Sequence, residues 1–166
     1  FAALHRAIEG AQREVWLATY IFHDDAHARG VAHALSRAAQ RGVRVGLVVD
    51  GFGTNRYLAT LHSWFHGGDV EWVVFRPLHR WWSWLQPGQL RRLHQKLCSV
   101  DGVIGFVGGI NIIDDRLDVT HGVTPTPRLD FAVEIRGPVV AAIEQTIRAV
   151  WSRAHLGASW REEALA

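Results

Sequence analysis

Cysteine, lysine and methionine are almost absent from this sequence. Its 166 residues contain one cysteine, no methionine and 18 lysines and arginines together, of which only Lys96 is a lysine. Cys98 has no second cysteine with which to form an internal disulfide, which is typical of a reducing compartment. The positive charge is therefore almost all arginine. Its planar fork suits phosphate and anionic lipid because it donates two parallel hydrogen bonds.

Strong net charge and long hydrophobic runs are also missing. The net charge is +2, which is too weakly basic to indicate nucleic-acid binding by itself. No run approaches the roughly 18–20 apolar residues that cross a membrane as a helix. The length predicts a single ordinary domain over residues 1–166. Because the sequence starts at Phe1 and not at Met, we expect it to be part of a longer protein.

Apolar residues recur with helical and strand spacing in alternation along the chain. The expected helices and strands are 1–12, 14–22, 26–41, 43–49, 55–66, 70–75, 93–100, 103–107, 129–135 and 137–154, of which the first, third, fifth and last are helices. Asp24 or Asp25 is expected to cap the second helix. The pair Asp101-Gly102 lies between two apolar runs and predicts a hairpin with a type I′ turn. The order predicts an α/β sandwich, in which helices flank a mixed, largely parallel sheet that includes one antiparallel β-hairpin.

One segment carries a fixed pattern of polar residues and glycines. Residues 94–111 read HQKLCSVDGVIGFVGGIN, which is H-x-K-x4-D-x6-G-G-x-N. Six fixed positions at roughly 5% each coincide by chance on the order of once in 10⁸ starting points. The six residues are His94, Lys96, Asp101, Gly108, Gly109 and Asn111.

The chemistry of this segment suits a phosphodiester. Residues two apart on a strand share a face, so His94 and Lys96 are predicted to point the same way. The ammonium would hold non-bridging oxygens while the imidazole attacks or protonates. The two glycines let the backbone approach a phosphate or the opposing strand, and Asn111 offers an amide donor beside the same phosphate. Asp101 falls in the hairpin turn, where we expect it to fix the turn by hydrogen bonds.

The pattern resembles the signature of the phospholipase D superfamily. Three segments are similar to bacterial cardiolipin synthases in particular: ATYIFHDDAHARGVAHALSRAAQRGVRVGLVVDGFGT, FRPLHRWWSWLQPGQLRRLHQKLCSVDG and GFVGGINIIDD. The resemblance implies a phospholipase D-like sandwich whose hairpin carries the motif. It also implies a reaction in which a histidine attacks the phosphodiester, an alcohol leaves and a second alcohol displaces the phosphohistidine. No metal or organic cofactor is implied. The catalytic residues so implied are His94, Lys96, Asp101 and Asn111, with Lys96, Gly108, Gly109 and Asn111 holding the phosphate.

A catalytic histidine usually needs a partner on its second ring nitrogen, which fixes the tautomer. Members of the family place a carboxylate on the strand after the motif, which makes Asp130 the candidate here. Glu134 lies four residues further on and shares a strand face, so it is the alternative. Asp130 is therefore added to the predicted catalytic residues.

These enzymes use two such motifs, one in each half, which meet across a pseudo-twofold axis. This chain has one motif, so we expect it to be one catalytic half, with a better match to the N-terminal one. The second half would come from a missing C-terminal region or from a second copy of the chain.

The stretch 76–92, RPLHRWWSWLQPGQLRR, combines tryptophans with arginines. Indoles are favoured at a bilayer interface and arginines near lipid phosphates. A lid over the site, a plug of the core and solvated loop charges are the alternatives. The membrane-contact candidates are Trp81, Trp82, Trp84, Arg80, Arg91 and Arg92.

Two further groups have simpler interpretations. His23, Asp24, Asp25 and His27 resemble a metal cluster, but a turn followed by a helix cap explains them, and we expect no metal site. Cys98 is expected to be a small buried hydrophobic residue and not a reactive thiol.

The sequence thus predicts an enzyme that joins phosphatidyl groups, making cardiolipin from phosphatidylglycerol or a related donor. We expect a peripheral protein at the cytoplasmic face of the bacterial inner membrane, with phospholipid substrates and no nucleic-acid partner. One alternative is a homodimeric phosphodiester hydrolase, either a phospholipase D or a nuclease, which the single motif favours. Another is a non-catalytic lipid-binding unit.

Overall fold

The structure, a computed structural model, describes residues 1–77 and 92–165, with side chains as far as residue 157. Its elements in chain order are α1 (Ala2–Glu9), β1 (Glu14–Thr19), α2 (Ala26–Gln40), β2 (Arg44–Asp50), η1 (Asn55–Tyr57), α3 (Leu58–Phe65), β3 (Val70–Phe75), β4 (Leu97–Val100), β5 (Ile104–Gly108), β6 (Leu117–Asp118), β7 (Gly122–Val123), β8 (Ala132–Arg136) and α4 (Val139–Leu165).

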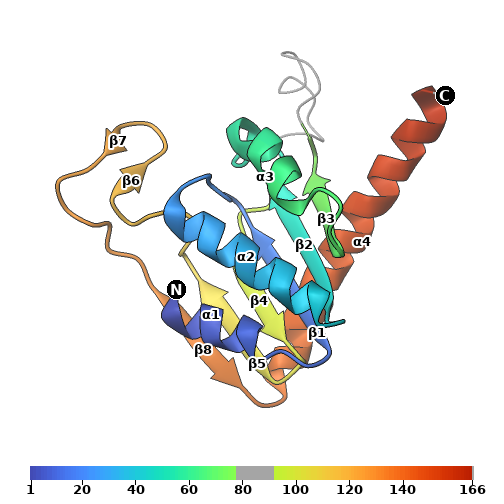
Figure 1. The fold of residues 1–166 in the computed structure, drawn as a ribbon, viewed down its shortest axis with the longest axis horizontal. Coiled ribbons are helices and arrows are strands. Elements are labelled where there is room, and N and C mark those ends of the chain that lie inside the picture. Colours follow the sequence, from blue (N-terminus) through green and yellow to red (C-terminus); the bar gives the residue numbers. More distant parts are fainter. Residues whose placement is uncertain (78–91, 166) are drawn as a thin grey trace.

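Six strands form one sheet in the order β3-β2-β1-β4-β5-β8 (Figure 1). The first three strands along the chain pair in parallel, because α2 and α3 return the chain over the sheet between them. β4 then joins β1 in the antiparallel sense, and β5 and β8 continue in the same way. β8 is therefore an edge strand, next to the hairpin that carries the motif.

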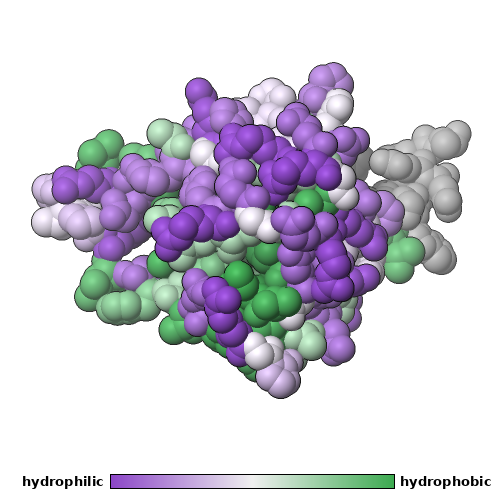
Figure 2. Space-filling view, turned by 60° about the horizontal axis from the view of Figure 1, so that its bottom comes forward, coloured by the Kyte–Doolittle hydropathy of each residue, from purple (hydrophilic) through white to green (hydrophobic). Residues whose placement is uncertain are grey.

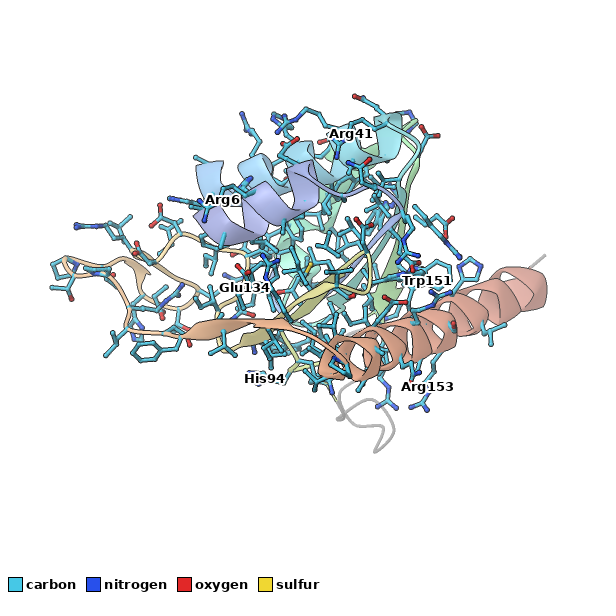
Figure 3. The ribbon with its side chains drawn as sticks, turned by 90° about the horizontal axis from the view of Figure 1, so that it is seen from below. Arg6, Arg41, His94, Glu134, Trp151 and Arg153 are labelled. Carbon is cyan, nitrogen blue, oxygen red and sulfur yellow. The ribbon has the colours of Figure 1, made fainter. Side chains whose placement is uncertain are left out.

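Helices cover both faces of the sheet. α1 and α2 lie on one face and α4 lies on the other (Figure 3). β1 and β2 are buried along almost their whole length, as expected for strands enclosed on both sides. The larger core cluster joins these strands to α1 and α2 through residues such as Ile8, Val31, Leu35 and Leu47. A second cluster packs Ile143 and Ile147 of α4 against the opposite face.

The predicted α/β fold, in which helices flank a mixed sheet that includes one antiparallel β-hairpin, is confirmed; of the five strand pairs in this sheet, two are parallel and three are antiparallel. Asp101 and Gly102 have φ angles of 56° and 67°, and a positive φ at both central positions is what a type I′ turn requires. Asp25 caps α2 by accepting a hydrogen bond from the backbone N of Ala28 at 2.9 Å, as predicted. The strand expected at 93–100 is shorter, because ladder pairing to β1 begins only at Leu97.

Candidate functional site

Three segments meet at the carboxyl end of β1. Tyr20 follows β1, residues 92–96 lead into β4, and residues 109–112 follow β5. The third segment is tied to the first by hydrogen bonds from Ile112 N to Ile21 O (3.0 Å) and from His23 N to Ile112 O (2.9 Å). The carboxyl ends of parallel strands are where open α/β sheets usually bind ligands. We therefore take this meeting point as the candidate site.

His94 and Lys96 lie together against the ring of Tyr20. The His94 and Tyr20 ring centroids are 4.9 Å apart, and Lys96 Nζ lies 5.4 Å from the centre of the Tyr20 ring. The Lys96 ammonium donates to the backbone O of His94 at 2.8 Å. His94 is exposed and Lys96 is partly buried. The two side chains predicted to share a face thus contact the same aromatic ring.

Burial and a nearby carboxylate have opposite effects on the pKa of Lys96. Burial lowers the pKa of Lys96 from its ordinary value, and the negative charge of Asp130 opposes that effect. Asp130 is exposed, and its Oδ1 accepts a hydrogen bond from Phe131 N at 2.8 Å. Among the residues that the structure describes, no hydrogen bond joins Asp130 to His94. Orientation of His94 by Asp130 therefore stays a prediction, whereas the electrostatic effect of Asp130 falls on Lys96.

Glu134, the alternative carboxylate, is engaged elsewhere. Its Oε1 accepts hydrogen bonds from Arg136 at 3.0 and 3.1 Å. Figure 3 shows Glu134 between β8 and α1. No hydrogen bond to His94 is found for it within the described part of the chain.

The two glycines of the motif allow a close approach of β8. A Cβ atom on Gly108 would overlap Phe131 O and Ala132, and one on Gly109 would overlap the Asp130 carboxylate. Their N–H groups already donate to backbone carbonyls, Gly108 to Lys96 O (3.3 Å) and Gly109 to Phe131 O (2.8 Å). Of the two roles expected for the glycines, the structure shows approach of the opposing segment. Phosphate binding by these N–H groups stays a prediction.

Asn111 lies at the same end of β1. Its Oδ1 accepts a hydrogen bond from Ile21 N at 3.1 Å. This bond fixes the side-chain amide and leaves the NH₂ group as the part that can donate to a phosphate.

Asp101 belongs to the other end of the sheet. Its carboxylate accepts hydrogen bonds at 2.8–2.9 Å from the backbone N–H groups of three consecutive residues, Gln12, Arg13 and Glu14. Glu14 is the first residue of β1, whereas Tyr20 follows its last. Asp101 therefore ties the hairpin turn to the start of β1, about 20 Å along the strand from Tyr20 at roughly 3.3 Å per residue. This geometry agrees with the structural role expected from the turn position of Asp101, and a part for Asp101 in catalysis stays a prediction.

Sequence reasoning missed the last residue of β2 and the loop that follows it, which hold the site in place. Asp50 is fully buried, and its carboxylate accepts hydrogen bonds from Phe52 N (2.8 Å), Gly53 N (3.1 Å) and Leu93 N (2.7 Å). Leu93 directly precedes His94, so this carboxylate positions the backbone that carries the imidazole. A polar residue directly after a buried strand was the signal for it.

Thr54 completes this support from the same loop. Its hydroxyl donates to Tyr20 O at 3.1 Å and accepts from Phe22 N at 3.1 Å. The loop therefore fixes Tyr20 as well as Leu93.

A largely apolar cavity of about 230 Å³ adjoins the motif. It lies between α1 and the strands β4, β5 and β8, and Figure 2 shows hydrophobic residues gathered across this face. Lys96 contributes to its wall, so a cationic group and an apolar space are adjacent. Apolar residues that line it include Leu4, Leu17, Phe106, Ile110 and Ile112.

Other predicted residues have separate outcomes. Cys98 is buried, which confirms the expectation, and burial raises the pKa of its thiol to about 12. Five of the predicted membrane-contact residues lie outside the described part of the chain: Trp81, Trp82, Trp84, Arg80 and Arg91. Arg92 is described, and its guanidinium lies 4.9 Å from the centre of the Phe52 ring.

Metal binding and membrane spanning find no support in the described residues. No group of three or more histidine, cysteine, aspartate or glutamate side chains in residues 1–77 and 92–157 is arranged to hold a metal ion. In the same part of the chain, no helix combines the length and the apolar character needed to cross a membrane.

Comparison with known proteins extends the resemblance to almost the whole chain. Residues 4–151 match the family described as cardiolipin synthase, PLD-like domain. Cardiolipin synthase A of Pseudomonas putida is 32% identical over 151 residues, which are 91% of this chain and 31% of that protein. Cardiolipin synthase B of Salmonella typhi is 33% identical over 145 residues, 87% of this chain and 34% of that protein. The chain thus spans about a third of the length of these relatives.

Two solved structures share the fold. Nuc of Salmonella typhimurium, a phospholipase D family member, has a TM-score of 0.65 at 19% identity, covering 91% of this chain and 86% of that one. NucT of Helicobacter pylori has a TM-score of 0.62 at 16% identity, covering 92% and 85%. At these identities the likeness concerns the fold alone. The family match over residues 4–151, together with His94 and Lys96 at one site, shows that the chain belongs to the family of phospholipase D-like domains of cardiolipin synthases.

Proposed function

We propose that this domain is one catalytic half of a phosphatidyltransferase that makes cardiolipin from phosphatidylglycerol or a related donor. The observation that carries the proposal is the placement of His94 and Lys96 on one aromatic ring, beside an apolar cavity whose wall includes Lys96. A phospholipid presents a phosphodiester next to acyl chains. It therefore matches a site in which a cation adjoins an apolar space.

The proposed reaction has two displacements at one phosphorus. A ring nitrogen of His94 attacks the donor phosphodiester, a P–N bond forms, and the P–O bond to the departing glycerol breaks as that oxygen takes up a proton. The hydroxyl of a second lipid then attacks the phosphohistidine, gives up its proton, and forms a new P–O bond as the P–N bond breaks. Lys96 balances the charge on the non-bridging oxygens in both steps, and the Asn111 amide donates to the same group.

A second motif is expected to complete the site, either from another part of the same protein or from a second copy. The edge strand β8 and the residues just before it support this proposal, because they expose large apolar side chains. Leu129 is 86% exposed, Phe131 71% and Val133 56%. A partner that covers this edge would also pair the open side of β8.

The alternative function is phosphodiester hydrolysis by a homodimer, as a phospholipase D or a nuclease. The presence of one H-x-K motif in this chain favours it. The cavity beside Lys96 favours a lipid over a nucleic acid, because most of its lining is apolar and suits acyl chains better than bases or sugars.

We also propose that the enzyme works as a peripheral protein at the cytoplasmic face of the bacterial inner membrane. The tryptophans and arginines within 76–92 support membrane contact, and a lipid substrate requires it. Sedimentation with vesicles that contain phosphatidylglycerol, compared with phosphatidylcholine vesicles, measures this contact. Equal recovery of protein with both kinds of vesicle would count against it.

The direct test of the function uses the full-length protein with phosphatidylglycerol in mixed micelles. The expected products are cardiolipin and free glycerol in equal amounts, and His94→Ala should abolish both while the thermal unfolding midpoint stays unchanged. Phosphatidate as the main product would favour the hydrolase. The molecular mass of the active particle, measured in the same sample, distinguishes a homodimer of this domain from a chain with two halves.

A further inference from the structure

Arg92 carries a polar atom that has no hydrogen-bond partner in the part of the chain that the structure describes. Its Nη1 is buried and makes no hydrogen bond, and its guanidinium lies over the Phe52 ring, 4.9 Å from the ring centre. A buried donor that belongs to a charged group costs free energy if it stays unpaired. The arrangement indicates a place for an anion that is bound during function.

Arg92 lies at the candidate site. It is two residues before His94, and the intervening Leu93 is held by Asp50 through its N–H group. Tyr20 contacts both His94 and Lys96. Burial and the charge of Asp50 raise the pKa of the Tyr20 hydroxyl, and the charge of Arg92 opposes these two effects. Tyr20 thus contacts His94 and Lys96, and the charge of Arg92 acts on the same residue.

The nearby acid does not neutralise Arg92. Both oxygens of Asp50 accept hydrogen bonds from backbone N–H groups, and no ion pair within 4.0 Å joins Asp50 to Arg92 in the described part of the chain. Lys96 is separate as well, because its ammonium bonds to His94 O. The site thus presents two independent cationic groups, whereas one phosphodiester at His94 requires only one.

We infer that Arg92 binds the phosphate of the acceptor lipid while Lys96 holds the phosphodiester of the donor. This inference rests on the proposed function and adds a determinant of acceptor choice to it. A guanidinium fork can give two parallel hydrogen bonds to one phosphate, and binding would supply the missing partner of Nη1. An acceptor with its own phosphate is then held at the phosphohistidine, in preference to water or a neutral alcohol.

The test measures how one intermediate is partitioned between acceptors. The full-length enzyme receives phosphatidylglycerol together with a fixed concentration of 1-propanol, and three products are quantified: cardiolipin, phosphatidylpropanol and phosphatidate. In Arg92→Gln we expect the ratio of cardiolipin to the other two products to fall at least about tenfold. This ratio does not depend on how much of the variant is folded.

Two further variants sharpen the comparison. Arg92→Lys keeps the charge but loses the fork, and should give an intermediate ratio. Arg6→Gln removes the same charge from an exposed position on α1 (Figure 3) and should leave the ratio unchanged.

Other outcomes overturn the inference in distinguishable ways. If Arg92→Gln lowers all three products equally, the guanidinium serves the donor or the fold, and the assignment to the acceptor is wrong. If it forms cardiolipin in the parental ratio, Arg92 has no role in acceptor choice. If the unaltered enzyme makes no phosphatidyl product at all, the proposed function is itself wrong and the inference fails with it.

Discussion

Asp50→Asn should weaken both the fold and the catalytic site, because one buried carboxylate serves three backbone donors. Asparagine keeps one oxygen for Phe52 N–H and Gly53 N–H, but places an NH₂ group against Leu93 N–H. In the flipped orientation the NH₂ group faces Phe52 N–H and Gly53 N–H, so two backbone donors are unpaired instead of one. An unpaired buried N–H costs about 1–3 kcal/mol, and the lost charge-assisted bond adds to that, so we expect a loss of about 2–4 kcal/mol in unfolding free energy.

For a domain of this size, each kcal/mol corresponds to roughly 2–4 °C in Tm, so the midpoint should fall by roughly 4–16 °C. Activity should fall further than stability explains. Releasing Leu93 moves the backbone of His94, and a displacement of about 1 Å near the reacting groups can cost on the order of 100-fold in rate. We expect kcat to fall roughly 10- to 100-fold at a temperature where the variant is folded.

Urea unfolding monitored by circular dichroism and turnover of phosphatidylglycerol are the two assays. Asp69→Asn, at an exposed position, is the matched control and should change the unfolding free energy by less than about 0.5 kcal/mol. An Asp50→Asn variant as stable and as active as the parent would refute the proposed anchoring of the site.

Three further predictions concern the glycine contact, the cavity and the hairpin anchor. Gly109→Ala should displace the Asp130 carboxylate, so that the pKa of Lys96 falls further. The alkaline limb of the pH–rate profile should then move to lower pH, and an alkaline limb at the parental pH would contradict this coupling. Ala132→Phe fills the cavity from β8 and should lower activity on long-chain lipids more than on dihexanoyl lipids. Val133→Phe, on the opposite strand face, should not show this difference between the two lipids. If Ala132→Phe lowered activity on both lipids equally, the result would argue against an acyl site. Burial acts to raise the pKa of Asp101, but hydrogen bonds from three backbone N–H groups outweigh it and lower that pKa. The stabilisation of the fold by ionised Asp101 is therefore complete above about pH 4 and is lost as the pH falls through the folded-state pKa. Asp101→Asn should therefore remove part of the acid dependence of the unfolding free energy, and an unchanged acid limb would contradict the anchor.

The features that sequence reasoning predicted best are those that depend on neighbours along the chain. Asp101-Gly102 specified its turn type because few residue pairs accept a positive φ twice in succession. Asp25 could be expected as a helix cap for a similarly local reason. His94 and Lys96 do lie against one ring, as their spacing of two residues suggested, although both precede β4 and therefore do not share a strand face.

The features it missed depend on residues distant in sequence. Leu93 is held by Asp50, 43 residues earlier, and Tyr20 is held by Thr54, 34 residues later. Periodicity and motif spacing contain no information on such contacts. Arg92 belonged in the sequence to an arginine-rich stretch expected at a membrane, and its buried Nη1 became evident only from its packing.

The central claim is that His94 carries the phosphatidyl group between the two lipids. The most direct measurement is peptide mass spectrometry of the full-length enzyme after rapid alkaline quenching during turnover of phosphatidylglycerol. We predict a phosphatidyl adduct on the peptide that contains His94, which forms within one turnover and is lost once the phosphatidylglycerol has been consumed. An adduct on a different histidine, with the peptide containing His94 unmodified throughout turnover, would contradict it.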